Sequence, residues 1–306
     1  MPMNSLIRLG SLPQSKLPAT TFATTSSYME ALAELHISHL INQRNDAVDS
    51  AEDCRHKLVA RFLFRKLARE HCLTAQWAAF DKGPFKLWCD NLRAANILLD
   101  EEGKVVGVVD WEFTYAAPVE FSFAPPWWLL IEKPEYWPQG LDDCCVEYER
   151  RLRTFLRAMR YQEDKAIKEG RLRDAQRLSA PMQDSWKSGD FWVAYAARNN
   201  FAFDLVYWHK IDQRFFGKTS TPVDDVWQES LDLLEPGERA EIERVVAIKV
   251  EEMKTRDLAW DPDDYTKELA EKRCKDAAKG DDIGGAKDGR DDGEDIEADE
   301  LVGLSL

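Results

Sequence analysis

The chain shows helical periodicity on both sides of one region, residues 85–111, in which apolar residues form short continuous runs. Apolar side chains recur every three or four positions from about residue 27 to 45 and again from about 50 to 70, which places them on one face of a helix. The sequence Ser27-Tyr-Met-Glu30 has the spacing of a capping box, in which a serine precedes a glutamate by three positions. The pattern therefore predicts two amphipathic helices, the first beginning at Ser27, ahead of a short β region.

The β region contains three apolar runs of strand length, Phe85–Cys89, Asn96–Leu99 and Lys104–Trp111. The segment Asp100-Glu-Glu-Gly103 lies between the last two runs, and Asp and Gly favour tight turns. We therefore predict a small β-hairpin, with its second strand mostly buried, after which the chain returns to helix.

The second half of the chain predicts further helices at residues 142–168, from about 188 to 208, and at 237–254. Aromatic residues crowd the middle one, which is typical of a core between helices. Aromatic residues then stop after Tyr265, and the polar tail through Glu300 cannot bury enough apolar surface to fold. The predicted fold class is α+β, mostly α-helical, with an extended lead-in at 1–25, a folded domain at 26–260 and an acidic disordered tail at 261–306.

The net charge of −15 over 306 residues is concentrated near the end of the chain. Eleven acids stand against three bases between Asp276 and Glu300, so this tract supplies −8. An acidic protein repels a phosphate backbone, so we expect no nucleic-acid partner. No apolar run reaches the length of a membrane span or of a signal peptide, so we expect no membrane partner and a cytoplasmic location.

The cysteines and histidines do not indicate a metal site. The six cysteines form no CxxC pair, and the five histidines lack zinc-like spacing. The acids at 288–297 are not at the intervals of a calcium-binding loop. We therefore expect reduced thiols in a reducing compartment.

Candidate chemistry is concentrated in Leu87-Trp-Cys-Asp-Asn-Leu-Arg-Ala-Ala-Asn96, which Asp110-Trp-Glu112 follows fourteen residues later. Phosphoryl transfer from ATP needs one carboxylate beside the acceptor hydroxyl, and a second carboxylate with an amide oxygen to hold magnesium. Oxygen ligands suit this cation. Any one Asp or Asn here is also explained by its preference for turns, so only the combination of these residues indicates a site.

These segments resemble the aminoglycoside phosphotransferase and choline-kinase-like family, in particular its fungal branch, over roughly residues 15–217. The family pattern is His-Gly-Asp-Leu/Phe-x-x-x-Asn-Ile/Val-Leu, followed by a strand that ends in Asp-Trp-Glu. The matching segments are Asn96–Asp100, Val108–Glu112 and Pro118–Phe121. The resemblance implies the C-terminal (catalytic) lobe of a protein-kinase-like fold, with a small β-hairpin at a site that uses Mg²⁺ and ATP.

The resemblance assigns the metal ligands to Asn96 and Asp110. Counting back five residues from Asn96 places Asn91 at the catalytic Asp position, and Asp90 at the usual Gly. An amide cannot accept a proton as a carboxylate does, so Asp90 and Asn91 are both candidate catalytic residues for positioning the acceptor. Arg93 is expected to contact a phosphate of the cofactor. Glu112 is expected either to support the loop after Asp110 or to be an ordinary surface carboxylate.

The family also has a small N-terminal sheet lobe, with a loop that covers the nucleotide and a Lys–Glu pair that holds the phosphates. Residues 27–70 look like catalytic-lobe helices, so we expect this lobe to be missing. Two hypotheses stay open. The first is a phosphotransferase that acts on a small hydroxylated or amino-alcohol acceptor, for which an acidic surface suits a cation. The second is an inactive pseudo-phosphotransferase, a binding or scaffold protein that contacts a protein partner over the uncovered lobe face.

Overall fold

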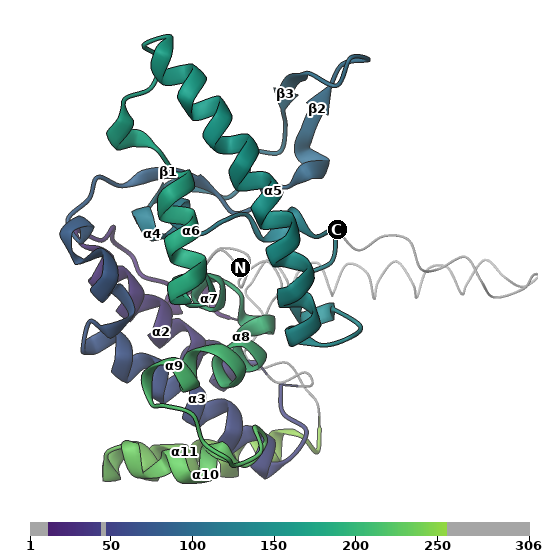
Figure 1. Ribbon diagram of the computed structural model, residues 1–306. Coiled ribbons are helices and arrows are strands. Elements are labelled where there is room, and N and C mark those ends of the chain that lie inside the picture. Colours follow the sequence, from purple (N-terminus) through teal and green to yellow (C-terminus); the bar gives the residue numbers. More distant parts are fainter. Residues whose placement is uncertain (1–11, 44–46, 256–306) are drawn as a thin grey trace, which may run out of the picture. The chain divides into compact units, whose positions relative to one another are not determined.

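The computed structural model describes residues 12–43 and 47–255 (Figure 1). The chain divides into two units, Met1–Trp260 and Asp261–Leu306, and every described residue belongs to the first. The predicted acidic tail at 261–306, with its 288–297 segment, lies outside the described residues. The described part is α+β and mostly helical, which confirms the predicted class.

Two helices precede the β region, as predicted, but the first begins earlier than its sequence suggested. Helix α2 (Thr25–Asn42) has Thr24 as its N-cap, and the Thr24 side chain accepts a hydrogen bond from the Ser27 backbone N–H at 3.2 Å. The prediction that Ser27 caps this helix is wrong, because Thr24 is the extended residue that meets the first exposed N–H groups. Helix α3 (Ala51–Arg69) begins after Ser50, whose hydroxyl accepts from the Asp53 N–H at 3.0 Å.

Helix α3 lies at the centre of the hydrophobic core. It packs against α2 on one side and against α11 (Pro236–Glu252) on another (Figure 1). Leu58, Phe62 and Leu63 of α3 are completely buried. Burying one such side chain contributes about 1.5–3 kcal/mol, so α3 supplies much of the hydrophobic stabilisation.

The β region forms two separate antiparallel pairs. Strand β2 (Ile97–Leu99) pairs with β3 (Val105–Val108), which confirms the predicted hairpin. Its turn is closed by Asp100, whose Oδ1 accepts from the N–H groups of Glu102 at 3.1 Å and Lys104 at 2.7 Å. The prediction that the second hairpin strand is mostly buried is wrong, because Val105 and Val106 are each 64% exposed.

Strand β1 (Lys86–Cys89) pairs with β4 (Thr114–Ala117), in a register that joins Lys86 to Ala117 and Cys89 to Thr114. We expected helix directly after Asp110, so β4 is a correction. Alanine has little preference for strands, and Thr114–Ala117 becomes a strand because β1 supplies its hydrogen-bond partners. The pair packs against α4 (Val119–Phe123).

The remaining helices are more divided than the periodicity predicted. Helix α5 (Leu141–Lys168) matches its prediction, whereas α6 (Ser179–Ser188) was not predicted. The aromatic-rich segment breaks at Asn199, where ψ is 95°, into α7 (Asp190–Arg198) and α8 (Asn200–Val206). A π-helical turn (Tyr207–Ile211), α9 (Asp212–Phe215) and α10 (Val226–Ser230) follow. The short 3₁₀ helices are Gln14–Lys16, Cys72–Phe80, Ala94–Asn96, Trp127–Leu129, Pro134–Tyr136, Asp174–Gln176 and Leu231–Leu233.

The aromatic side chains of α7, α8 and the π-helical turn form a core, as predicted. Tyr195, Phe203 and Tyr207 are almost completely buried and belong to the main hydrophobic cluster. None of the helices in the described part combines the length and the apolar composition that crossing a lipid bilayer requires.

Candidate functional site

The candidate site is built by two loops that hydrogen bonds join, residues 90–96 after β1 and residues 109–113 after β3. The Asp90 N–H donates to the Phe113 carbonyl at 3.4 Å, and the Val109 N–H donates to the Asn96 carbonyl at 2.9 Å. Asp110 and Phe113 have left-handed backbones, with φ of 56° and 59°. For a bulky residue such as Phe113 this conformation is uncommon and costs about 1–3 kcal/mol. Such strain is typical of functional sites, and the joined loops hold it in place.

Asn96 and Asp110, the predicted metal ligands, contact each other across the base of the hairpin. The Asn96 Nδ2 donates to the Asp110 Oδ2 at 2.7 Å. Asn96 is 2% exposed, and its Oδ1 is buried without a hydrogen-bond partner among the described residues. A buried polar oxygen that lacks a partner is unfavourable, so this atom is available to a ligand.

The chemistry of this pair fits Mg²⁺. The cation prefers carboxylate and amide oxygens, and it is commonly held by one or two protein groups together with waters and phosphates. Within residues 12–43 and 47–255, no group of three or more His, Cys, Asp or Glu side chains is placed to hold a metal. A cation at Asn96 and Asp110 would therefore take its other ligands from water and from a bound phosphate.

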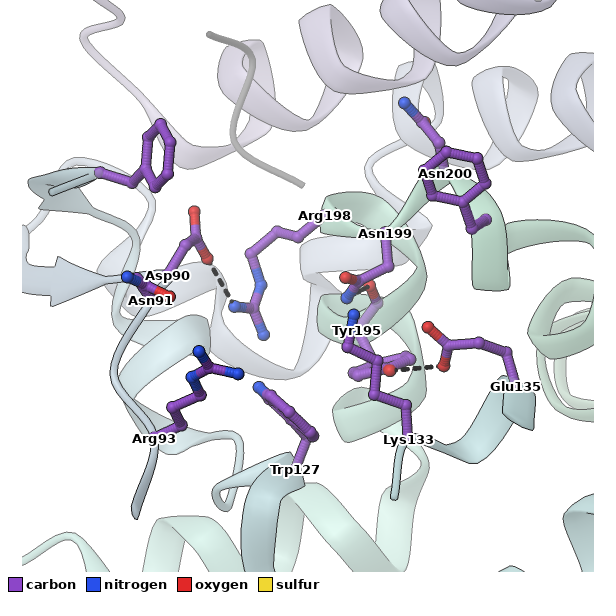
Figure 2. A pocket seen from close by; sticks show the side chains of 12 residues that line it. Asp90, Asn91, Arg93, Trp127, Lys133, Glu135, Tyr195, Arg198, Asn199 and Asn200 are labelled. Carbon is purple, nitrogen blue, oxygen red and sulfur yellow. Dashed lines mark hydrogen bonds and ion pairs between the residues drawn. The ribbon is translucent and has the colours of Figure 1, made fainter. Parts of the chain in front are cut away.

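The Asp90 side chain, one of the two candidate catalytic groups, is committed to an ion pair with Arg198 of α7. Its carboxylate accepts a hydrogen bond from Arg198 at 2.9 Å (Figure 2). It also accepts hydrogen bonds from Trp88 at 2.8 Å and from Tyr115 at 2.9 Å. The Arg198 guanidinium also lies 4.7 Å from the ring centres of both Trp88 and Phe121. The carboxylate is 9% exposed, so it is held firmly inside the protein.

The ion pair keeps Asp90 in its charged form. Burial on its own raises the pKa of Asp90, but the positive charge of Arg198 and the hydrogen bond from Trp88 outweigh it, so the pKa lies below its ordinary value. A carboxylate with a lowered pKa and three bound donors is a weak proton acceptor. Asp90 therefore anchors the loop more readily than it takes a proton.

Asn91, the other candidate catalytic residue, points to the other loop. Its Nδ2 donates to the Glu112 Oε1 at 3.3 Å. Glu112 thus contacts the 90–96 loop from the side of the Asp110 loop. The Cys89 thiol contacts the Glu112 carbonyl at 3.4 Å and reinforces the same junction.

A polar cavity of about 250 Å³ opens beside these loops (Figure 2). Its lining residues are Asp90, Asn91, Arg93, Phe113, Trp127, Lys133, Glu135, Tyr195, Arg198, Asn199, Asn200 and Phe201. Arg198 is paired with Asp90, and Glu135 accepts a hydrogen bond from Tyr195 at 2.7 Å. Arg93 has a buried Nε without a hydrogen-bond partner among the described residues. Arg93 and Lys133 therefore give this cavity groups that can bind an anion such as a phosphate.

Arg93, which was predicted to contact a phosphate, is one of the residues that line this cavity. Lys133 and Arg198 were missed because they come from segments far along the chain. Arg198 could have been recognised from the sequence in one way, since it ends an apolar helix in which a lone arginine needs a buried partner.

Comparison of the chain with protein-family models, with curated proteins and with solved structures found no match.

Proposed function

We propose that this chain is a kinase-like phosphotransferase of the aminoglycoside phosphotransferase and choline-kinase-like type. It binds Mg²⁺ and ATP at Asn96 and Asp110, and it transfers the γ-phosphoryl group slowly to a small hydroxylated acceptor. The observation that carries the proposal is the contact between the Asn96 amide and the Asp110 carboxylate, together with the Asn96 amide oxygen, for which the described part of the chain supplies no hydrogen-bond partner. The proposed fold is the C-terminal lobe of a protein kinase, and ATP chemistry with free thiols favours the cytoplasm.

The reaction assigns a task to each group in the site. The acceptor oxygen forms a bond to the γ-phosphorus while the bond from that phosphorus to the ADP oxygen breaks, and the hydroxyl proton leaves to a base. Bound magnesium would supply positive charge against the phosphates. Arg93 and Lys133 would bind phosphate oxygens from the polar cavity.

Neither candidate catalytic residue is an efficient proton acceptor. Asn91 has an amide where a carboxylate is needed, and the Asp90 carboxylate is paired with Arg198. The proton would then pass to water, and losing a general base typically lowers the rate by about 10²–10⁴. For this reason we propose slow transfer.

The second candidate function is a pseudo-phosphotransferase that binds a protein partner. It is favoured by the exposed apolar side chains of the β2–β3 hairpin. Leu99 is 57% exposed, and Val105 and Val106 are each 64% exposed. Exposed apolar patches often mark interaction surfaces, so a partner would cover the hairpin.

Thermal unfolding with MgATP tests the nucleotide site. MgATP should raise the melting temperature of the wild type, and EDTA should remove the effect. At a ligand concentration of about 100 Kd the stabilisation is about 2.7 kcal/mol. Asp110→Asn should abolish the shift because it removes the carboxylate, whereas Glu101→Gln, which removes an exposed charge from the hairpin turn, should keep it. An unshifted wild type, or an equal shift in the Asp110 variant, would contradict the proposal.

A further inference from the structure

A second cavity, of about 350 Å³, lies against the same 90–96 loop. Asp90, Trp127 and Arg198 line both cavities and form the wall that they share. Most of the other lining residues come from β1, the segment 122–128, α6 and α7. The chain therefore places a second binding volume next to the candidate site.

This second cavity is mainly apolar and carries no net charge. Its lining includes the indole rings of Trp111 and Trp128, and the side chains of Met182 and Phe191. Among the described residues, Asp90 and Arg198 are the only charged ones in its lining, and they neutralise each other at 2.9 Å. The cavity therefore offers no unpaired carboxylate for an ammonium group and no unpaired cation for an acid.

The composition and the volume select a class of ligand. Pockets of about 300–1,000 Å³ with aromatic walls and a few polar groups are typical of small-molecule sites. Flat indole walls favour stacking with a planar ring. A cavity of about 150 Å³ accommodates benzene, so about 350 Å³ has room for a molecule of about two fused rings.

We propose that the apolar cavity binds the ring system of the acceptor, a neutral aromatic alcohol or phenol. The identification of this ligand as the acceptor rests on the proposed phosphotransferase function. Asp90 is at the wall shared with the polar cavity, and Asn91 follows it in the chain. A hydroxyl at this end of the ligand faces the loop that carries the candidate catalytic position.

Calorimetric titration with 2-naphthol, without nucleotide, tests the cavity, and choline serves as the cationic probe. The wild type should bind 2-naphthol and should not bind choline. Leu178→Trp fills the cavity with a larger side chain and should weaken 2-naphthol binding at least tenfold. Trp128→Ala removes one aromatic wall and should weaken it several-fold, while Tyr136→Ala removes an aromatic side chain that is 59% exposed and lines neither cavity, and should leave binding unchanged.

Thermal unfolding of each variant shows whether it is folded. If Leu178→Trp does not fold, the 2-naphthol affinity of Trp128→Ala alone tests the cavity. Absence of 2-naphthol binding to the wild type, equal binding by all folded variants, or tighter binding of choline would overturn the proposal. If MgATP raises the melting temperature but 2-naphthol does not bind, the proposed phosphotransferase function stands and the proposed aromatic acceptor is wrong. If 2-naphthol binds but MgATP does not raise the melting temperature, the apolar ligand site stands and the proposed phosphotransferase function is wrong.

Discussion

At the scale of single residues, Asp90 and Asn91 are neighbours with different surroundings. The Asp90 carboxylate is buried among three donors, whereas the Asn91 amide donates to Glu112 on the adjoining loop. The two residues lie in a turn, which the Leu92 N–H closes by donating to the Cys89 carbonyl at 3.3 Å, and their side chains have these separate partners, so Asp90 does not occupy the place of the Asn91 side chain. An Asp side chain at position 91 would place a carboxylate where the Asp90 side chain does not reach.

The first prediction is that Asn91→Asp raises the rate of phosphoryl transfer by about 10²–10⁴, because it supplies a general base. Formation of ADP from MgATP, with and without 2-naphthol, measures the rate. Asn91→Ala is the control and should show no gain; an Asn91→Asp rate equal to the wild-type rate would count against the site.

Glu120 of α4 is a buried carboxyl group without a hydrogen-bond partner for either side-chain oxygen among the described residues. Burial, with smaller contributions from Asp190 and Asp81, raises its pKa from 4.5 to about 7. The folded state therefore binds this proton more tightly than the unfolded state does. The resulting stabilisation is complete below about pH 4.5 and is lost as the pH rises through about 7.

The second prediction is that Glu120→Gln abolishes this pH dependence. Between pH 5 and pH 8 the wild type should lose about 2–3 kcal/mol of unfolding free energy through Glu120, because burial disfavours its charged form. The variant should lose much less, since glutamine does not titrate. Urea denaturation of both proteins at the two pH values measures the difference, and parallel losses would show that Glu120 is not the titrating group.

At the scale of elements, the start of α2 depends on which side chain meets its first N–H groups. Thr24 is extended and accepts from the Ser27 N–H, whereas the Ser27 hydroxyl donates back to the Thr24 carbonyl at 2.9 Å. Only Thr24 therefore satisfies a backbone donor of the helix in this pair. An isolated capping-box sequence could not reveal this, because Thr24 and Ser27 are both chemically suitable caps.

The third prediction ranks these two residues. Thr24→Ala should lower the unfolding free energy by about 1 kcal/mol, the usual cost of removing an N-cap. Ser27→Ala removes a hydroxyl that caps no N–H group in this pair, so it should cost less. Urea denaturation of the two variants measures both losses of unfolding free energy. A larger loss for Ser27→Ala than for Thr24→Ala would mean that Ser27 is the cap.

The Asp90–Arg198 pair joins the loop after β1 to the end of α7. Both side chains are 9% exposed, and the guanidinium also lies over Trp88 and Phe121. Removing one member leaves the other as a buried charge that lacks compensation, which is more costly than losing the pair as a whole.

The fourth prediction follows from this asymmetry. Arg198→Met should lower the unfolding free energy by about 3–5 kcal/mol, because it leaves Asp90 charged and buried. Adding Asp90→Asn to this variant should recover part of the loss, since it removes the stranded charge. Denaturation of the single and double variants completes the cycle. Additive losses would mean that the two side chains do not stabilise each other.

At the scale of the folded unit, α3 connects helices from both ends of the described chain. It packs against α2 and α11, and its Leu58 is completely buried. The fifth prediction is that Leu58→Ala lowers the unfolding free energy by about 2–5 kcal/mol, because it leaves a cavity in the core. Ile131→Ala, at a fully exposed side chain, should change it by less than about 0.5 kcal/mol. Urea denaturation of both variants measures the difference, and equal effects would contradict this core assignment.

The elements that the sequence predicted well are those decided by local patterns. Helices α3 and α5 have strong apolar periodicity, and the Asp100–Gly103 turn specified the hairpin. The misassigned features depend on contacts with distant segments. Strand β4 exists because β1 pairs with it. Strand β3 was predicted to be buried because apolar runs usually are, but no other element of the described chain covers Val105 and Val106.

The sequence by itself determined the helical character of this protein. It also determined that Asn96 lies near Asp110, because the hairpin between them brings its two ends, fourteen residues apart, close together. Only the tertiary structure decided the surroundings of these two residues. Arg198 reaches Asp90 across 108 positions, and the walls of both cavities come from segments that meet only when the core packs. Contacts of this kind depend on how buried surfaces fit together, and no local pattern of polar and apolar residues encodes that fit.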